Sequence, residues 1–434
     1  MRIAYLAAGA AGMYCGSCLH DNALAAALLR AGHDVALVPL YTPLRTDGEG
    51  VAVDRVFYGA INVYLEQRSA LFRHTPWLVD RMLAAPGLIA WATRHSGSVD
   101  ARELGELTVS VLRGAEGRQK KELDGLVSWL AREMRPEVVH LPNALLAGLA
   151  GPIRRQLGVP VLCTLQGEDL FIEDLEEPHY ATVRRLLVEA CRDVDAFVVH
   201  SEFYAQAMAE YLAVPRERIH VVRLGLERDA TAGDGPGPAA RPFVVGYLAR
   251  VAPEKGLHLL AGAFHELARQ SASGDVRLRI AGYLSERDRA YKEGILAQLE
   301  AWGLSDAVED LGEVDRAGKV AFLRSLHVLC VPTTYREPKG LFALEALAQG
   351  VPVVLPRHGA FPELIEATGG GMLVEPDDTA SIAAALRGLM DDPERRAALG
   401  RSGREVVRRD YRDDRTATSL LSLYQDCRQN AQRG

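Results

Sequence analysis

The stretch ATAGDGPGPAARPFVVGYLA, residues 230–249, decides the fold because two different patterns meet in it. Residues 230–242 are dense in Gly, Pro and Ala, a composition that cannot form a packed core and is typical of a linker between domains. The apolar run 243–249 that follows is typical of a buried strand. With 434 residues, the chain is also long for one hydrophobic core. The stretch therefore predicts two domains.

Both halves alternate short apolar runs with helical segments, which is the pattern of parallel sheets with crossover helices. Before the linker the expected strands are 2–8, 34–41, 138–142, 159–165 and 195–201, with helices at 22–30, 121–134 and 180–191. After it they are 243–249, 277–283, 308–312, 328–333, 352–356 and 371–376. We therefore predict an α/β protein with two Rossmann-like domains that face each other across a cleft.

The predicted N-terminal domain covers residues 1–230 and the linker covers 231–242. The C-terminal domain covers 243–415, and a helix over 416–434 is expected to pack back on the N-terminal domain. Residues 58–118 interrupt the first βα alternation with Arg, His and aromatic side chains. This insertion is either a helical cap or an element that binds the acceptor or a membrane surface.

Composition excludes several classes of protein. The net charge of −7 argues against nucleic acid as a partner, since phosphate binding needs a basic face. Six cysteines in so long a chain do not make a disulfide framework. No apolar run is long enough to span a membrane. We therefore expect a cytoplasmic protein, with peripheral membrane contact left open by the insertion.

The segment VPTTYREPKGLFALEALAQGVPVVLP, residues 331–356, holds the chemistry. A buried strand ends near its start, and a helix begins near Gly340. The amides of Gly340, Leu341 and Phe342 at the helix start offer an anion site. Glu337 precedes this helix, and Glu345 lies on an otherwise apolar part of it, where a carboxylate needs a partner or a ligand. Two carboxylates beside an anion site describe a pocket for a sugar and a ribose joined by a diphosphate.

These residues carry a resemblance to a known family. Glu337-x7-Glu345, followed by EALAQGVPVV, resembles the E-x7-E motif of the retaining glycosyltransferases of family 4, which have the GT-B fold. GYLARVAPEKGLHLL, with Gly246, Arg250 and Lys255, resembles a second motif of that family. Further matching pieces follow in the family's order over almost the whole chain.

The resemblance implies a role for each matching residue. Arg250 and Lys255 pair with the diphosphate of a nucleotide-sugar donor and, with Glu337, form the catalytic set. Leu341 and Phe342 offer amides to phosphate, and Gly246 and Gly340 belong to the donor site. Glu345 accepts hydrogen bonds from the ribose, Val314 lies near the base, and Gly12 lies in the loop after the first strand. No metal and no cofactor is expected, because the nucleotide sugar is a substrate.

The sequence departs from the family pattern at several positions. Gln166 stands where many members have a histidine, and Glu168 and Asp169 follow it closely. Lys339 adds a cation beside the phosphate-binding residues. His200, which ends a strand, either touches a ligand or is a satisfied buried histidine. We keep these five residues as further candidates for the site.

The activity that follows is transfer of a sugar, with retention at the anomeric carbon, from a nucleoside diphosphate sugar to an acceptor. The acceptor is a small molecule, a lipid-linked sugar or a polysaccharide. One alternative is a sugar-nucleotide epimerase on the same fold. The other is a dithiol redox protein that uses Cys15 and Cys18, which form a C-x-x-C after the first strand. The sequence does not identify the base, the sugar or the acceptor.

Overall fold

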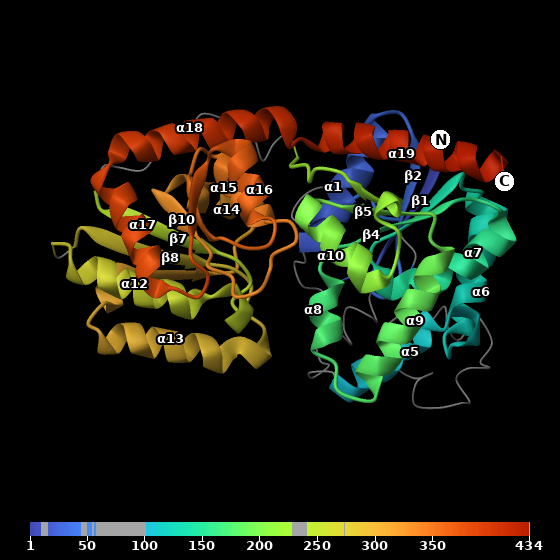
Figure 1. Ribbon diagram of the computed structural model, residues 1–434, viewed down its shortest axis with the longest axis horizontal. Helices are drawn as coiled ribbons and strands as arrows, with labels where there is room; N and C mark the ends of the chain where they lie inside the picture. Colours follow the sequence, from blue (N-terminus) through green and yellow to red (C-terminus); the bar gives the residue numbers. More distant parts are fainter. Residues whose placement is uncertain are drawn as a thin grey trace. The chain divides into compact units, whose positions relative to one another are not determined.

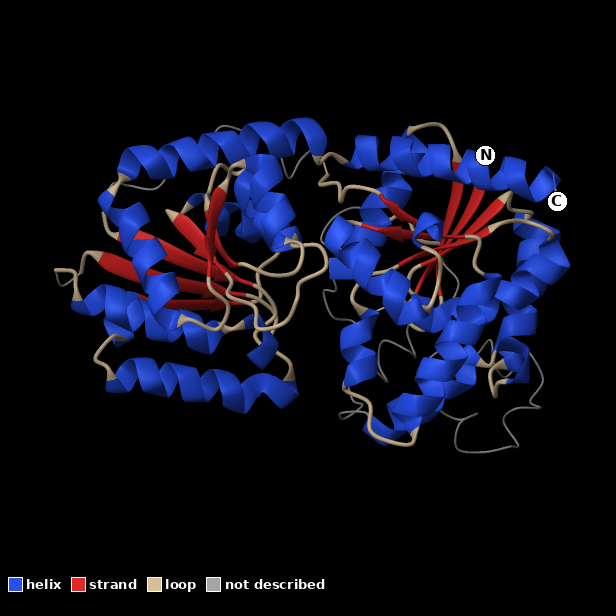
Figure 2. Ribbon diagram, in the orientation of Figure 1, coloured by secondary structure: helices blue, strands red, loops and turns tan. Residues whose placement is uncertain are grey.

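The computed structural model describes residues 1–9, 16–44, 50–53, 56–57, 101–227, 241–272 and 274–433. The chain forms two compact units, one of residues 1–223 with 414–434 and one of residues 224–413. In each unit the strands form one sheet that lies between helices (Figures 1 and 2). The predicted α/β class with two parallel-sheet domains is thus confirmed.

Unit 1 contains a six-stranded parallel sheet in the order β2-β1-β3-β4-β5-β6. Val, Ile, Leu and Ala dominate its strands and are buried, as expected for strands covered on both faces. The strands are β1 (Arg2–Ala7), β2 (Asp34–Pro39), β3 (Val138–Leu141), β4 (Val161–Thr164), β5 (Ala196–Val199) and β6 (Ile219–Val221). The strand order changes direction between β1 and β3, where Ile3 pairs with Val138.

The helices of unit 1 connect these strands as crossovers. They are α1 (Gly16–Arg30), α5 (Ala101–Leu112), α6 (Lys120–Trp129), α7 (Ala150–Leu157), α8 (Glu168–Glu173), α9 (His179–Ala190) and α10 (Glu202–Leu212). Shorter turns are η2 (Gly114–Glu116), η3 (Leu130–Met134), η4 (Ala144–Leu149), η5 (Cys191–Asp193) and η6 (Arg216–Arg218). Ser201 begins α10, because its side chain accepts a hydrogen bond from the Tyr204 amide.

Unit 2 contains a second six-stranded parallel sheet, in the order β12-β11-β10-β7-β8-β9. Its strands are β7 (Phe243–Leu248), β8 (Val276–Ala281), β9 (Val308–Gly312), β10 (Val328–Cys330), β11 (Val353–Pro356) and β12 (Gly371–Val374). Here the strand order changes direction between β7 and β10, which pair through Val245 and Val328. This is the strand order of a dinucleotide-binding Rossmann sheet.

The helices of unit 2 follow its strands in the same crossover pattern. They are α12 (Leu257–Arg269), α13 (Arg289–Ala301), α14 (Arg316–Arg324), α15 (Leu341–Ala348), α16 (Phe361–Thr368), α17 (Thr379–Asp391) and α18 (Pro393–Asp410). Shorter turns are η7 (Pro253–Lys255), η8 (Glu286–Asp288) and η9 (Ser305–Ala307). Leu260, Phe264, Val328 and Leu347 are among the fully buried side chains of its core.

The last helix, α19 (Asp413–Arg433), packs on unit 1 although the preceding helix belongs to unit 2. Leu420 and Tyr424 of α19 join one core cluster with Ile3, Tyr5 and Leu28. Tyr424 is completely buried there. The C-terminal segment is therefore part of the N-terminal hydrophobic core.

Each expected strand is present, and its ends differ from the expected ones by at most three residues. The additional strand β6 was not predicted, because Ile219–Val221 is too short to show a periodic pattern. Within the expected insertion, α5 and η2 are helical, while residues 58–100 lie outside the described residues. Most of the expected linker lies outside them too. No helix in the described ranges is both long and apolar enough to cross a membrane.

Candidate functional site

The candidate site of unit 2 lies where the strand order of its sheet changes direction. The loops that follow the adjacent strands β7 and β10 leave the same edge of the sheet, and such a point is where open α/β sheets bind ligands. The first loop carries Arg250 and leads through η7 into α12. The second carries Tyr335 and Glu337 and leads into α15. The topology therefore brings the two predicted motifs together.

These two loops approach each other so closely that a side chain is excluded at Gly256. This residue has φ +73°, and a Cβ built on it would lie 1.7 Å from the Pro332 carbonyl oxygen. The Thr334 amide donates a hydrogen bond to the Glu254 carbonyl at 3.0 Å. Glycine and this backbone hydrogen bond hold the two loops in register.

Three side chains from these loops meet in one cluster. Lys255 Nζ lies 2.9 Å from Glu337 Oε2, and the Tyr335 hydroxyl contacts both groups, accepting from Lys255 and donating to Glu337. Glu337 is 4% exposed, and its Oε1 accepts from the Gly340 amide at 3.3 Å. Burial alone acts to raise the pKa of Glu337, but the Lys255 ammonium and these hydrogen bonds hold it below its usual value. Glu337 is thus a buried, ionised carboxylate.

Arg250 lies beside this cluster and is held by two carboxylates. Its guanidinium contacts Glu254, and it donates to Asp288 at 3.3 Å. The side chain of Asp288 is 7% exposed, whereas that of Arg250 is 37% exposed. The two carboxylates therefore hold the Arg250 guanidinium in place, and its exposed part is still accessible to an anion from solvent.

Helix α15 begins at this cluster. Gly340 precedes it with φ +66°, and the amides of Leu341 and Phe342 in its first turn have no acceptor within the helix. Phe342 is buried and packs edge-to-face on Phe361. The helix start thus lies next to Lys255, whose Nζ is 5.7 Å from the Phe342 ring centroid. Amides, helix dipole and cation together make this position electrostatically suited to an anion.

Glu345 lies one turn further along α15. Its Oε1 is 2.6 Å from Lys319 Nζ, which belongs to α14. The two side chains are 14% and 20% exposed, so both are largely shielded. Glu345 therefore has the partner that its apolar surroundings require.

The structure thus brings Arg250, Lys255, Glu337 and the start of α15 together. Gly246 lies inside β7, where a Cβ would be 2.1 Å from Leu326, so it permits close packing below the site. Val314 follows β9 and packs against the core, and Lys339 is half-buried just before α15. Tyr335 and Lys319 were missed. Nothing in their local sequence signals that they pair with Glu337 and Glu345.

In unit 1, polar side chains gather at the carboxyl ends of β1, β3 and β4. Gln166 Nε2 donates to the Pro142 carbonyl at 2.9 Å and to Asp21 at 3.3 Å. Asp21, on α1, is 1% exposed and also accepts from the Tyr5 hydroxyl at 3.0 Å. Sequence reasoning identified Gln166 but missed Asp21, which lies 145 positions away along the chain.

Glu168 and Asp169 organise the loop that follows β4. The Glu168 carboxylate accepts from the amides of Ala144 and Gln166 at 2.7 and 2.6 Å. Burial raises its pKa, and these hydrogen bonds oppose the rise. Asp169 accepts from the Tyr204 hydroxyl at 2.6 Å. Both carboxylates thus hold backbone and neighbouring helices in place.

Two histidines lie near this group. His200 Nδ1 is 2.9 Å from the Val222 carbonyl oxygen, and its ring meets that of His20 edge-to-face at 4.8 Å. His140 is completely buried between Tyr424 at 2.7 Å and Thr164 at 2.6 Å.

Gly12 and Cys15, which follow β1 in the sequence, lie outside the described residues. Cys18 is buried on α1, 3% exposed.

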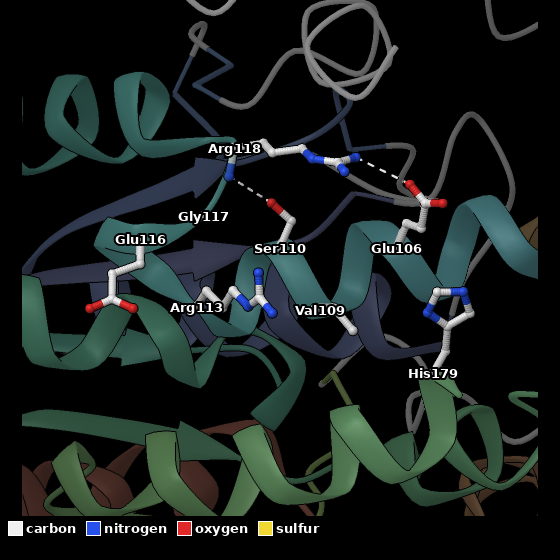
Figure 3. Close-up of a pocket in the computed structure, with 8 residues that line it drawn as sticks. All are labelled: Glu106, Val109, Ser110, Arg113, Glu116, Gly117, Arg118 and His179. Atoms are coloured by element: carbon white, nitrogen blue, oxygen red, sulfur yellow. Dashed lines mark hydrogen bonds and ion pairs between the residues drawn. The ribbon is translucent and has the colours of Figure 1, made fainter. Parts of the chain in front are cut away.

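A separate pocket in unit 1 is drawn in Figure 3. It has a volume of about 110 Å³ and is lined by Glu106, Val109, Ser110, Arg113, Glu116, Gly117, Arg118 and His179. Arg118 pairs with Glu106 at 3.1 Å across it. Pockets that hold drug-sized ligands are several times larger, so it is too small for a nucleotide sugar.

Comparison with known proteins agrees with this geometry. The family model "Glycosyl transferases group 1" matches residues 234–406 and "Glycosyltransferase Family 4" matches residues 90–230. Together the two models match most of the chain, and the α/β architecture is that of GT-B enzymes. The protein therefore belongs to the family 4 glycosyltransferases.

Curated relatives extend over much of the chain. The D-inositol 3-phosphate glycosyltransferase of Mycolicibacterium smegmatis is 28% identical over 90% of this chain and 90% of its own. The glycogen synthase of Mycobacterium tuberculosis is 26% identical over 68% of this chain and 69% of its own.

Solved structures share the fold at low identity. Sucrose-phosphate synthase from Thermosynechococcus elongatus superposes with a TM-score of 0.71 at 18% identity, covering 98% of both chains. Anabaena HepE in complex with UDP superposes with a TM-score of 0.68 at 16% identity, covering 98% of this chain and 100% of its own.

Proposed function

We propose that this glycosyltransferase moves a sugar from a nucleoside diphosphate sugar to a hydroxyl group of an acceptor, with retention at the anomeric carbon. The observation that carries the proposal is the meeting of Lys255, Glu337 and the start of α15 at the point where the strand order changes direction. Cations and helix amides suit a diphosphate, and the carboxylates suit hydroxyl groups on either side of it.

Each residue has a task in this reaction. Lys255, Arg250 and the first amides of α15 bind the diphosphate and stabilise the charge that develops as the sugar leaves. Glu345, held by Lys319, accepts hydrogen bonds from the ribose. Glu337 orients the donor sugar. Because these groups already carry compensating charges, the site is organised before the donor binds.

The stereochemical course follows from a leaving group that also acts as the base. As the bond between the anomeric carbon and the diphosphate breaks, a diphosphate oxygen takes the proton of the acceptor hydroxyl, which attacks from the same face. Lys255 and Arg250 supply the countercharge, so we propose that turnover needs no divalent metal. Polar side chains of unit 1, Gln166 among them, are candidates for contacts with the acceptor.

The acceptor is a compound rich in hydroxyl groups. The relatives named above include an enzyme named for D-inositol 3-phosphate and one named for glycogen synthesis. A polyol phosphate and a polysaccharide are therefore the first acceptors to test, followed by a lipid-linked sugar.

The first experiment is a thermal-shift scan with UDP, GDP, ADP, TDP and their sugars, with and without EDTA. We expect one base to raise the melting temperature, without loss of the effect in EDTA and with loss of it in Glu345→Ala. UDP is tested first, since HepE was solved with UDP. If no nucleotide shifts the wild-type protein, the donor site is wrong.

A second experiment tests the catalytic roles. Lys255→Ala and Arg250→Ala should lose donor turnover while remaining folded by circular dichroism, although Lys255→Ala leaves the buried Glu337 carboxylate without its ammonium partner and therefore lowers the melting temperature. Lys292→Ala is the matched control, because Lys292 forms an ion pair with Asp310 at 2.5 Å in the same unit and neither residue belongs to the predicted donor site. Normal turnover in Lys255→Ala or Arg250→Ala, or product of inverted anomeric configuration by NMR, would contradict the mechanism.

A further inference from the structure

We propose that Tyr335 is a positioning residue of the donor site, whose hydroxyl fixes the Lys255 ammonium and the Glu337 carboxylate in one arrangement. The inference rests on the proposed function, because it assigns Lys255 and Glu337 to donor binding. Tyr335 belongs to neither predicted motif, but its hydroxyl contacts Lys255 of one and Glu337 of the other.

The geometry makes the hydroxyl a link between opposite charges. Lys255 Nζ donates to the Tyr335 oxygen, and the Tyr335 hydroxyl donates its proton to Glu337 Oε2. The same Nζ also donates directly to Oε2 at 2.9 Å. A closed triangle of three polar groups has one low-energy arrangement, whereas a lone lysine side chain has many rotamers.

The protonation of the triangle agrees with this role. Burial and then the Glu337 charge raise the pKa of Tyr335, so the phenol keeps the proton that it donates. The surrounding charged groups are Lys255 on η7 and, around the phenol, Arg250 and Glu254. On the neighbouring loop His358 Nε2 is 2.9 Å from the Thr333 carbonyl oxygen.

The backbone of both loop residues of the triangle, Tyr335 and Glu337, is held by hydrogen bonds. The Thr333 hydroxyl donates to the Tyr335 carbonyl at 3.1 Å, and the Glu337 carbonyl accepts from the Ala360 amide at 2.8 Å. A Cβ at Gly359 would lie 2.6 Å from that same Glu337 oxygen, so the backbone there has no room to shift. These backbone contacts therefore restrict the position of the Tyr335 hydroxyl relative to Glu337.

The choice of lysine at this point is unusual for the chain. The chain contains only six lysines among its 50 basic residues. Lys255 and Lys339 lie next to the start of α15. Lys319 pairs with Glu345 of the same helix. A lysine ammonium is a compact charge on a flexible stem, so it needs an external group to hold it, whereas a guanidinium is rigid by itself. Tyr335 supplies that group.

The test removes one oxygen atom with Tyr335→Phe and measures the binding of UDP, GDP, ADP and TDP by calorimetry. We expect affinity for the nucleoside diphosphate that binds best to fall about tenfold, which is the loss of one hydrogen bond to a charged group. Affinity for the corresponding nucleoside, which lacks the diphosphate, should not change. Tyr211→Phe is the matched control, because its hydroxyl donates to Glu173 at 2.9 Å in unit 1.

A double-mutant cycle separates positioning from a structural role. If Tyr335 acts through Lys255, Tyr335→Phe should have little further effect on diphosphate binding in the Lys255→Met protein. Additive effects, or equal losses of nucleoside and diphosphate affinity, would overturn the proposal.

NMR of the lysine ammonium groups tests the positioning role without any ligand. With only six lysines, the side-chain ammonium signals in a ¹H–¹⁵N correlation spectrum can be assigned by single Lys→Arg changes. We expect the Lys255 signal to shift or broaden in Tyr335→Phe, while the Lys292 signal stays unchanged. An unchanged Lys255 signal overturns the inference and leaves the proposed function standing. Failure of wild-type protein to bind any of the four diphosphates removes both.

Discussion

Lys319 Nζ lies 2.6 Å from Glu345 Oε1, so the second glutamate of the predicted motif is held by a cation from a different helix. The pair repeats, one helical turn away, the arrangement of Lys255 with Glu337 at 2.9 Å. Each carboxylate of the candidate donor site is thus oriented by a lysine that lies far from it in the sequence.

The first prediction concerns this pair. Lys319→Met keeps the length of the side chain but removes the charge, so Glu345 loses the partner that holds it in the proposed donor site. We expect nucleoside diphosphate affinity to fall about three- to tenfold by calorimetry, corresponding to about 1 kcal/mol for a largely shielded pair.

Lys292→Met is its control, because it breaks a similar ion pair, with Asp310, and neither residue belongs to the predicted donor site. Stability should fall to a similar extent in both variants, whereas affinity should fall only in Lys319→Met. Equal affinity in the two proteins would show that Glu345 does not need Lys319.

The second prediction concerns the contact between the two site loops. In Gly256→Ala a Cβ would lie 1.7 Å from the Pro332 carbonyl oxygen, in addition to the strain of φ +73°. We expect a loss of at least about 2 kcal/mol in the free energy of unfolding of unit 2, measured by urea titration.

Gly303→Ala separates strain from collision, since Gly303 has φ +72° and a Cβ added there would meet nothing within 4 Å. This variant should lose only about 1 kcal/mol and keep its nucleotide affinity. Were the two variants equally stable, the loops would not be in the close contact described above.

The third prediction is a pH dependence from His140. Burial, and to a lesser extent His200, lowers its pKa to about 3 from an ordinary value of 6.5. Between these values the unfolded chain binds a proton that the folded chain does not. The stability contributed by neutral His140 is therefore present above pH 6.5 and is lost as the pH falls toward 3.

Urea titration at neutral pH and near pH 5 measures this effect. Wild-type unit 1 should lose up to about 2 kcal/mol more than His140→Gln on acidification. His179→Gln, at the partly exposed start of α9, should retain the wild-type loss. A loss of the same size in His140→Gln would mean that His140 does not cause it.

The fourth prediction concerns the two cysteines of the C-x-x-C. Cys18 is buried on α1, which disfavours a role in thiol exchange, since such a thiol must be reached by its partner. Cys15→Ser/Cys18→Ala should therefore keep the thermal shift with nucleotide and the rate of sugar transfer. Loss of activity in this double variant, with full activity in Glu345→Ala, would favour the dithiol alternative.

How far the sequence predicted the site depends on how local each contact is. Glu337 and Gly340 are three positions apart, and their relation to a helix start was evident from the glycine between two apolar patterns. By contrast, Tyr335 contacts Lys255 across 80 positions and Gln166 contacts Asp21 across 145. No periodicity records such a meeting.

The sequence by itself determined the fold class and the approximate positions of the expected strands. Alternating buried strands and amphipathic helices are local patterns, because burial on both faces of a parallel sheet selects Val, Ile and Leu in short runs. The same is true of the start of α15, whose position follows from a strand end and Gly340. These features depend on neighbours within one turn or strand.

Only the tertiary structure decided which charges are paired. The order of strands in each sheet places the loops after β7 and β10 side by side, and this brings Lys255 to Tyr335 and Glu337. The order of strands likewise brings Asp21 within hydrogen-bond distance of Gln166. Core packing brings the Tyr424 hydroxyl of the last helix to His140. Sheet order depends on how all the strands pack together, so no single segment of the sequence contains it.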